Sequence, residues 1–305
     1  MSPEEPKKIG LIIGREWSWP SAFINEVNQR DDGVVAEFVK LGGTALENVY
    51  DYQVIIDRMS HEIPYYRTVM KHAAMQGVYT INNPFTWSTD DKFIGLAAVR
   101  DAGLNTLPTT VLPNKRVESH HVPESFRNLD YPMDWKGIID RVGVPAILKD
   151  VHTGSREFAR RVSNVDDLIR TYDESDTRTV ILQPIIETNE YIHCFVFGQE
   201  QARVLAFNRD EDNYLEKADF IDEQTEAAVI TAARRICQLY GYDMNMAEFI
   251  MHEGELVVVN PSNPVPEIDI DQMPAEHFKW CVRALADFAI RMAHDPQPQT
   301  GWHRS

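Results

Sequence analysis

The stretch AEFIMHEGELVVVNPSNPVPEID, residues 247–269, contains the pattern on which the fold prediction depends. Two apolar runs flank the turn sequence HEGE, which predicts a β-hairpin. The second strand ends at NPSNP, whose asparagines and prolines are typical of a turn. Glu248 lies within the first strand, and the hairpin brings it toward Asn260 and Asn263. Because a buried acid needs a partner such as Mg²⁺, the hairpin predicts a metal site, unless Glu248 faces water on a one-sided strand.

The bulk composition is that of a globular protein with two or three subdomains. The chain has 305 residues, of which 43% are hydrophobic and 25% are charged. Its 47 acidic and 30 basic residues give a net charge of −17, which disfavours general nucleic-acid binding. Cys194, Cys237 and Cys281 are too far apart for a zinc motif and suggest a reducing compartment. No apolar window is long enough for a membrane span, so we expect a soluble, cytoplasmic protein without a membrane partner.

The order of predicted strands and helices divides the chain into an α/β unit followed by two α+β units. Strands and helices alternate over residues 1–88, which predicts a Rossmann-like unit with a parallel sheet but without a GxGxxG loop. Residues 89–182 form the second predicted unit, with an irregular insertion at 114–136. Residues 183–294 form the third, which ends in a long helix, and we expect residues 295–305 to be a disordered tail.

Two lysines and one apolar strand suggest a nucleotide site between the second and third units. Lys149 ends the apolar strand VPAILKDV, and Lys92 lies at a helix start; either one could instead simply be solvated. The strand VILQPIIETNEY contains Pro184, which removes a donor and predicts an edge or cleft-lining strand suited to adenine recognition. Glu190 follows closely and could hold a ribose hydroxyl, or be a loop acid in water.

In this order the elements resemble the ATP-grasp superfamily of carboxylate–amine ligases, nearest to its RimK-like and D-alanine–D-alanine-ligase-like group. The resemblance covers roughly residues 80–292. DDKFIGLAAVRDAGLNTLPTT resembles the family pattern DKxxxxxxLxxAGxPxPxT, VPAILKD resembles xPxVxKP, and residues 247–269 resemble xDFxxxxxGxxxxxExNxxPG. The resemblance implies a Rossmann-like pre-ATP-grasp domain followed by a two-part ATP-grasp fold, an α/β and α+β architecture.

The resemblance also implies the chemistry and the residues that perform it. Members activate a carboxylate with ATP and Mg²⁺ (or Mn²⁺) as an acyl phosphate, which an amine then attacks, so small-molecule carboxylate and amine substrates are expected. Homodimers are common in the group. The implied ATP ligands are Lys92, Lys149, Gln183, Ile186, Glu190 and Lys217; the metal ligands are Glu248, Asn260 and Asn263; and the catalytic residues are Lys217 and Arg209.

Two departures from the family pattern leave a second hypothesis open. Asn260 and Pro261 stand where members usually carry a second metal carboxylate, and an amide brings no negative charge. The loop after Lys149 contains only Gly154, where members are usually glycine-rich, although Arg156 could supply charge. The alternative is a degenerate ATP-grasp protein that binds nucleotide, metabolite or partner without ligation. A generic Rossmann oxidoreductase is disfavoured because the glycine fingerprint is missing.

Three residues are predicted to face the substrate. Arg15 follows the first strand in GREWSWP, where it could pair with a carboxylate, although Trp17 and Trp19 could equally pack there as core. Arg58 follows another strand of the first unit. His193 stands where relatives often carry a basic residue.

Overall fold

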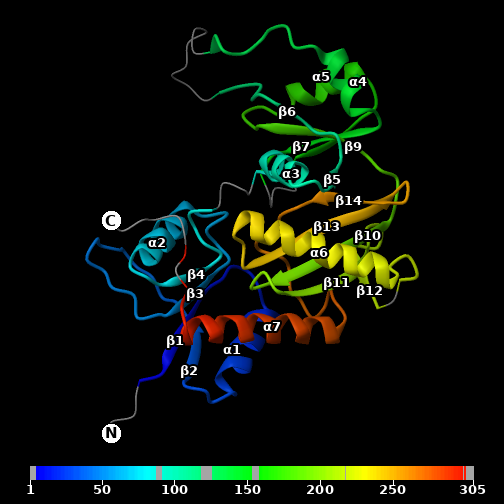
Figure 1. Ribbon diagram of the computed structural model, residues 1–305. Coiled ribbons are helices and arrows are strands. Elements are labelled where there is room, and N and C mark those ends of the chain that lie inside the picture. Colours follow the sequence, from blue (N-terminus) through cyan, green and yellow to red (C-terminus); the bar gives the residue numbers. More distant parts are fainter. Residues whose placement is uncertain are drawn as a thin grey trace.

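The computed structural model describes residues 5–86, 91–117, 126–152, 158–216, 218–297 and 299. The chain forms three β-sheets, of four, six and four strands. Figure 1 shows the second four-stranded sheet, with α4 and α5, at one end of the molecule and the six-stranded sheet in the middle. The N-terminal sheet lies beside the long helix α7 at the other end. This mixed architecture confirms the predicted fold class.

The N-terminal sheet has the strand order β2-β1-β3-β4, and all its pairs are parallel. Ile9, Leu11 and Ile56 face helix α1, whereas Ile12 and Ile55 face helix α2, because successive strand residues point to opposite faces. The order in which strands are added to the sheet therefore changes sides between β1 and β3. Open α/β sheets place ligands at such a switch point. The elements are β1 (Lys7–Ile12), α1 (Ser18–Asn28), β2 (Val34–Phe38), β3 (Val54–Asp57), α2 (Pro64–Met75) and β4 (Tyr79–Ile81).

The six-stranded sheet has the order β12-β11-β10-β13-β14-β5 and is covered by α6 on one face and α7 on the other. Cys194 and Val196 pack under α6, while Phe195 and Phe197 pack under α7. Its elements are α3 (Lys92–Asp101), β5 (Asn105–Thr106), β10 (Glu190–Phe197), β11 (Gln201–Asn208), β12 (Asn213–Leu215), α6 (Glu223–Tyr240), β13 (Met244–His252), β14 (Glu255–Asn260) and α7 (Ala275–His294).

The smaller sheet, which we name the lid sheet, has the order β6-β9-β7-β8. Ala146, Leu148 and Leu182 pack on its helix-covered face, so Ile147 and Lys149 lie on the opposite face. Its elements are β6 (Thr110–Leu112), α4 (Trp135–Val142), β7 (Ala146–Asp150), β8 (Ala159–Val162), α5 (Val165–Asp173) and β9 (Val180–Pro184). Strand β9 contains Pro184, which predicted an edge or cleft-lining strand. It lies between β6 and β7, and only its residues Gln183 and Pro184 have no partner on β6.

The segment around α3 and β6 links the six-stranded sheet to the lid sheet. Asn105 and Thr106 pair with β14, whereas Thr110 begins β6 in the lid sheet. Asp91 caps α3, since its carboxylate accepts hydrogen bonds from the Phe93 and Ile94 backbone N–H groups. The predicted domain boundaries stay predictions, and the one at 182/183 falls inside β9.

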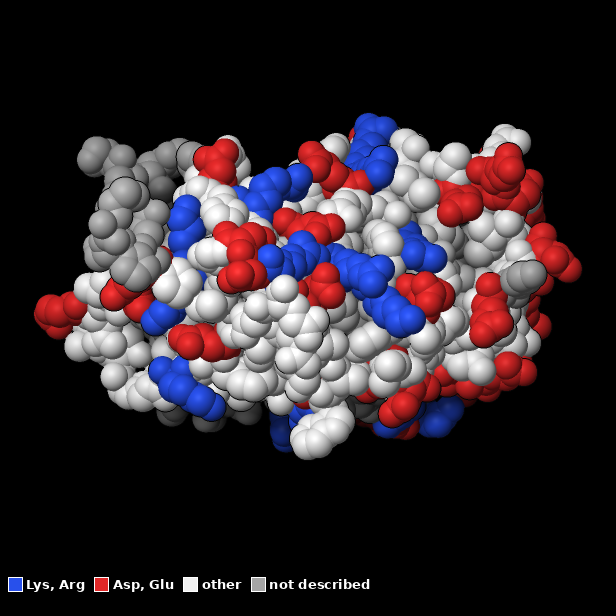
Figure 2. All heavy atoms as spheres, turned by 90° about the horizontal axis from the view of Figure 1, so that it is seen from below, with Lys and Arg blue, Asp and Glu red and all other residues white. Residues whose placement is uncertain are grey.

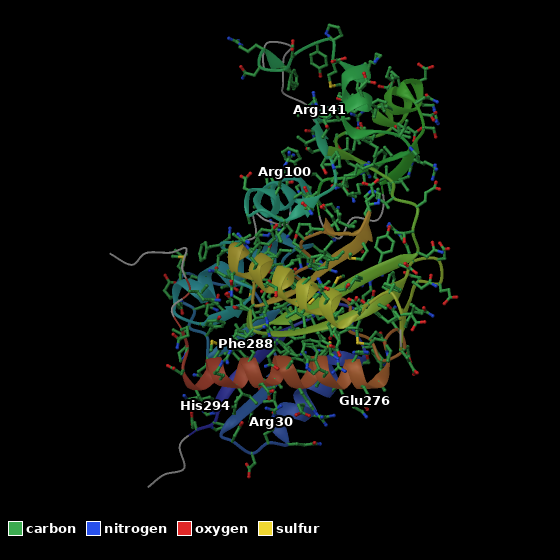
Figure 3. All side chains as sticks on the ribbon, turned by 45° about the vertical axis from the view of Figure 1, so that its right-hand side comes forward. Arg30, Arg100, Arg141, Glu276, Phe288 and His294 are labelled. Atoms are coloured by element: carbon green, nitrogen blue, oxygen red, sulfur yellow. The ribbon has the colours of Figure 1, made fainter. Side chains whose placement is uncertain are left out.

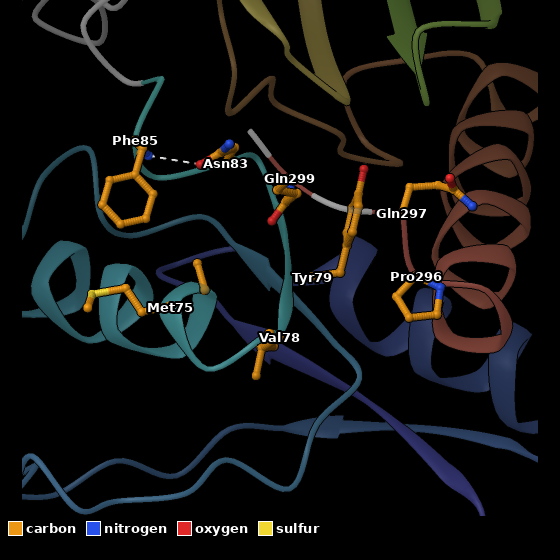
Figure 4. A pocket seen from close by; sticks show the side chains of 10 residues that line it. Met75, Val78, Tyr79, Asn83, Phe85, Pro296, Gln297 and Gln299 are labelled. Atoms are coloured by element: carbon orange, nitrogen blue, oxygen red, sulfur yellow. Dashed lines mark hydrogen bonds between the residues drawn. The ribbon is translucent and has the colours of Figure 1, made fainter. Parts of the chain in front are cut away.

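Gln299, within the segment expected to be a disordered tail, contacts the N-terminal sheet, and the expectation for residues 295–305 stays a prediction. The Gln299 amide accepts a hydrogen bond from Thr80 N at 2.9 Å and donates one to Thr80 O at 2.6 Å. The side chain thereby occupies the free edge of β4. A pocket of about 330 Å³ lies beside this contact. Figure 4 shows its lining between α2 and the tail, which includes Met75, Tyr79 and Pro296. None of the predicted ATP ligands lines it.

Helix α7 joins the N-terminal sheet to the six-stranded sheet. Figure 3 shows Phe288 pointing from α7 toward the sheets, while Glu276 and His294 lie near its two ends. On the outer face, Figure 2 shows basic and acidic side chains interspersed, in keeping with the Arg30–Asp287 and Arg291–Glu200 ion pairs. Among the described residues, no helix combines the length and apolarity that crossing a membrane requires.

Candidate functional site

Lys149 of the lid sheet lies within the electrostatic reach of the six-stranded sheet. Burial lowers the pKa of Lys149 to about 8, while the charge of Glu248 opposes this shift and that of Arg209 adds to it. Glu248 lies on β13 and Arg209 directly follows β11, so the charges that influence Lys149 come from the six-stranded sheet. Gln183 lies on the same face of the lid sheet as Lys149, two residues along the paired strand. The site is therefore formed between the lid and six-stranded sheets.

Lys92 lies beside Lys149. It is the first residue of α3, and its ammonium donates to the carbonyl oxygens of Asp150, at 2.9 Å, and of His152. Burial, followed by the charge of Lys149, lowers the pKa of Lys92 to about 8. Two desolvated ammonium groups repel each other unless an anion lies between them. The pair therefore favours a bound phosphate or carboxylate.

Glu248 is the centre of a row of polar residues that crosses three strands. His193 of β10, Glu248 of β13 and Asn260 of β14 are direct cross-strand partners, so their side chains share one face. The His193 Nε2 atom lies 3.2 Å from Glu248 Oε2. Burial tends to raise the pKa of this carboxyl, but the His193 hydrogen bond and the charges of Arg209 and Lys149 outweigh burial and lower it.

Asn260 contributes a buried oxygen with no hydrogen-bond partner. Its Oδ1 atom is inaccessible to solvent and unpaired. An unpaired buried carbonyl oxygen costs about 1–3 kcal/mol, so a ligand there is stabilising. A β-bulge between Glu248 and Phe249 leaves Val259 unpaired in the register beside Asn260. Bulges re-aim side chains, which is common beside functional sites. Glu248 and Asn260 therefore fit a divalent cation.

Asn263 lies further along the same hairpin. Its backbone pairs with Met246, two residues before Glu248, through hydrogen bonds of 2.9 and 3.0 Å. Its side-chain Oδ1 accepts a hydrogen bond from Val265 N at 3.3 Å, which closes the turn. A second lone pair on this oxygen stays available for a ligand. The metal role of Asn263 therefore stays a prediction.

Aromatic side chains that the sequence reasoning missed surround His193 and Arg209. The Tyr214 hydroxyl lies 3.0 Å from His193 Nδ1, and the Phe207 ring stacks on the imidazole with centroids 4.5 Å apart. Arg209 Nη1 donates to the Tyr191 hydroxyl at 2.5 Å. Burial tends to lower the pKa of this guanidinium, but Tyr191 and Glu248 raise it. Tyr191 and His193 alternate along β10, which was the available sequence signal.

The predicted adenine and ribose residues are placed less closely together. The buried Gln183 side chain donates to Thr109 Oγ1 at 2.9 Å. Ile186 packs with Leu107 and Tyr191 in a small apolar cluster beside the site. Glu190 is exposed at the first position of β10. These positions leave the assigned roles as predictions.

Arg58 is a buried cross-link between units. Its guanidinium forms an ion pair with Glu16, donates to the Pro266 carbonyl at 2.6 Å, and lies 5.1 Å from the Trp19 ring. Burial lowers the pKa of Arg58, although the charge of Glu16 opposes this shift. These contacts tie the loops after β1 and β3 to the segment that follows β14. These contacts link parts of the fold, and the predicted substrate role of Arg58 stays a prediction.

The other predicted substrate and phosphate residues are spread more widely. Arg15 is exposed after β1; of its neighbours, Trp19 is buried core, whereas Trp17 is 87% exposed. Lys217, Gly154 and Arg156 lie outside the described residues. Within the described ranges, no three His, Cys, Asp or Glu side chains form a group that could hold a metal ion. The polar row of His193, Glu248 and Asn260 instead contains an imidazole, a carboxylate and an amide.

Comparison with known proteins finds a distant relative by sequence and similar folds among solved structures. No protein-family model matches the chain. The D-alanine–D-alanine ligase of Ralstonia nicotianae is 25% identical over 217 residues, which are 60% of this chain. The match covers 64% of that relative, less than two thirds of its length.

Solved structures resemble the chain over nearly its whole length. The RimK-domain ATP-grasp protein of Sphaerobacter thermophilus superposes with a TM-score of 0.67 and 18% identity, covering 93% of this chain and 99% of that one. The VanG D-Ala:D-Ser ligase of Enterococcus faecalis superposes with a TM-score of 0.68 and 16% identity, covering 94% of this chain and 99% of that one. The D-alanine–D-alanine ligase of Bacillus anthracis complexed with ATP superposes with a TM-score of 0.62 and 16% identity, covering 95% of this chain and 99% of that one.

Proposed function

The chain has the ATP-grasp fold, and on that premise we propose that it binds ATP between its lid and six-stranded sheets and joins a carboxylate to an amine. The observation that carries the proposal is the row of His193, Glu248 and Asn260 across three strands, whose Glu248, with Arg209, acts electrostatically on Lys149 of the lid sheet. A desolvated cation beside a carboxylate with a lowered pKa suits a triphosphate and its metal ion.

Each residue has a distinct task in this proposal. Lys92 and Lys149 bind the phosphates, and Lys217 is proposed to add a third cation near the γ-phosphate. Glu248, Asn260 and Asn263 would hold the metal ion, which when bound neutralises charge on the phosphate oxygens. Arg209, held by Tyr191, stabilises the negative charge that develops on the transferred phosphoryl group.

The proposed reaction has two steps between the substrates. A carboxylate oxygen attacks the γ-phosphorus of ATP, the bond to the β-phosphate oxygen breaks, and ADP leaves. The amine nitrogen then attacks the acyl carbon, the carbon–oxygen bond to phosphate breaks, and the amine loses a proton. Closure of the site between two sheets excludes water, which would otherwise hydrolyse the acyl phosphate.

Turnover of ATP tests this proposal directly. The purified chain is incubated with ATP, Mg²⁺ or Mn²⁺, and a panel of amino acids and small carboxylates, and ADP and phosphate are measured. We expect ADP formation that requires both a carboxylate and an amine. Absence of ADP formation with every pair and either cation would contradict ligation.

The neutral Asn260 supports a second candidate, a protein that binds nucleotide or metabolite without ligation. Asn260 pairs directly with Glu248 at the position where the resemblance implies a second carboxylate. Calorimetry with ATP, with and without Mg²⁺, separates the candidates. Tight binding that depends on Mg²⁺ favours the ligase, whereas binding that ignores Mg²⁺ favours the second candidate.

Replacing Lys149 with Ala is expected to weaken ATP binding about 30-fold or more, because it removes a half-buried cation from the triphosphate. Calorimetric titration with ATP measures the effect. Lys136→Ala is the matched control, since Lys136 lies on α4 of the lid unit and pairs with Asp140 on its surface. An unchanged ATP affinity in Lys149→Ala would show that this lysine does not bind phosphate.

Replacing Asn260 with Asp is expected to tighten Mg²⁺ binding about 10-fold, because it adds a carboxylate beside Glu248. The dissociation constant for Mg²⁺ is measured in the presence of a non-hydrolysable ATP analogue. Asn245→Asp is unsuitable as a control, since the Asn245 amide is buried and donates to Pro261 O. Asn48→Asp, on the distant N-terminal unit, is the better control. An unchanged or lower Mg²⁺ affinity in Asn260→Asp would show that Asn260 does not bind the metal ion.

A further inference from the structure

The imidazole of His193 has the position and orientation of a metal ligand beside Glu248. It is 5% exposed, and it directly faces Glu248 across the β10–β13 pair. The Tyr214 hydroxyl at Nδ1 and the stacked Phe207 ring fix the ring so that Nε2 faces the carboxylate. Metal-binding histidines are oriented in this way, by a hydrogen bond at the other ring nitrogen.

The His193 Nε2 and Glu248 Oε2 atoms share a hydrogen bond when Nε2 carries a proton, and without that proton their spacing also suits two ligands of one ion. Two donor atoms bound to a divalent cation at about 2.1 Å, with angles of about 90–110°, lie roughly 3.0–3.4 Å apart. The Nε2 and Oε2 atoms are 3.2 Å apart. On the far side of Glu248, the buried Asn260 Oδ1 atom lacks any hydrogen-bond partner. The row therefore offers a nitrogen, a carboxylate and an amide oxygen on one face.

We propose that His193, Glu248 and Asn260 form a divalent-cation site in which the imidazole replaces the missing second carboxylate, so that the chain selects a cation tolerant of nitrogen over Mg²⁺. Mg²⁺ prefers an all-oxygen octahedral shell, whereas Co²⁺, Zn²⁺ and, less strongly, Mn²⁺ accept imidazole. The inference rests on the proposed function, because it assigns the cation of that site. It does not require that ligation takes place.

The test compares cation affinities in the full-length chain, with and without a non-hydrolysable ATP analogue. Calorimetry gives the dissociation constants for Co²⁺ and Mg²⁺ in the wild type, in His193→Gln, and in His252→Gln. His252 is the matched control because it lies at the hairpin end of β13, the strand that carries Glu248, and pairs with Glu255. We expect His193→Gln to reduce the ratio of Co²⁺ to Mg²⁺ affinity at least about 10-fold, and His252→Gln to leave it unchanged.

A second measurement needs no variant. The wild-type chain loaded with Mn²⁺ is examined by electron spin echo spectroscopy, and we expect nitrogen modulation from a coordinated imidazole. The absence of that modulation, an unchanged affinity ratio in His193→Gln, or the failure of the wild type to bind any divalent cation in either condition overturns the inference. If ATP does not bind but the cation results hold, the proposed function fails and the cation site stands.

Discussion

Glu248→Gln is expected to lower ADP formation about 10²–10³-fold and to abolish the dependence of ATP binding on a divalent cation. Gln keeps the size of the side chain but removes the only carboxylate in the row with His193 and Asn260. The cation then loses its charged ligand, and charge on the phosphates is no longer neutralised. Initial rates of ADP release and calorimetric titration with ATP, each over a range of Mg²⁺ and Mn²⁺ concentrations, measure the two effects.

Glu253→Gln is the matched control for this variant. Glu253 is exposed and lies in the turn of the same hairpin, so the substitution removes an equal charge from the same hairpin. ATP turnover is expected to stay at the wild-type level in that variant. If Glu248→Gln retains cation-dependent ATP binding, the cation is held elsewhere, and both the metal assignment and the mechanism are wrong.

Arg58→Ala is expected to lower the free energy of unfolding of the N-terminal unit by about 3–5 kcal/mol. The change leaves Glu16 without its ion-pair partner and the Pro266 carbonyl without its donor, both beside a guanidinium that is almost completely buried. Removing one member of a buried pair costs more than the pair contributes, because the remaining charge stays desolvated. Amide hydrogen exchange in β1 and β3, together with urea denaturation, measures the loss.

Arg170→Ala is the control for an ordinary surface cation, since Arg170 pairs with Asp167 in water on α5. It is expected to cost less than about 1 kcal/mol. A stable Arg58→Ala variant whose only defect is a raised KM for the carboxylate substrate would instead support the sequence prediction that Arg58 binds substrate.

Local sequence patterns were sufficient for much of the fold. The turn at Glu253 and Gly254, where both residues have positive φ, defines the β13–β14 hairpin as predicted from HEGE. Helix α6 begins after the Asp222 cap and ends at the left-handed Gly241, and both signals lie within one turn of the helix they delimit. Short-range hydrogen bonding decides these features, so the neighbouring residues carry the information.

Tertiary structure alone decided which polar residues meet. His193 and Glu248 are 55 positions apart, and only the pairing of β10 with β13 makes them neighbours. Arg58 is predicted from the sequence to face substrate, and only the tertiary structure shows its contact with Pro266, 208 positions away. The local pattern of the sequence predicts Glu248 and Asn260 as metal ligands, and that role stays a prediction. The role of the histidine depended on strand register, which long-range packing sets and no local pattern encodes.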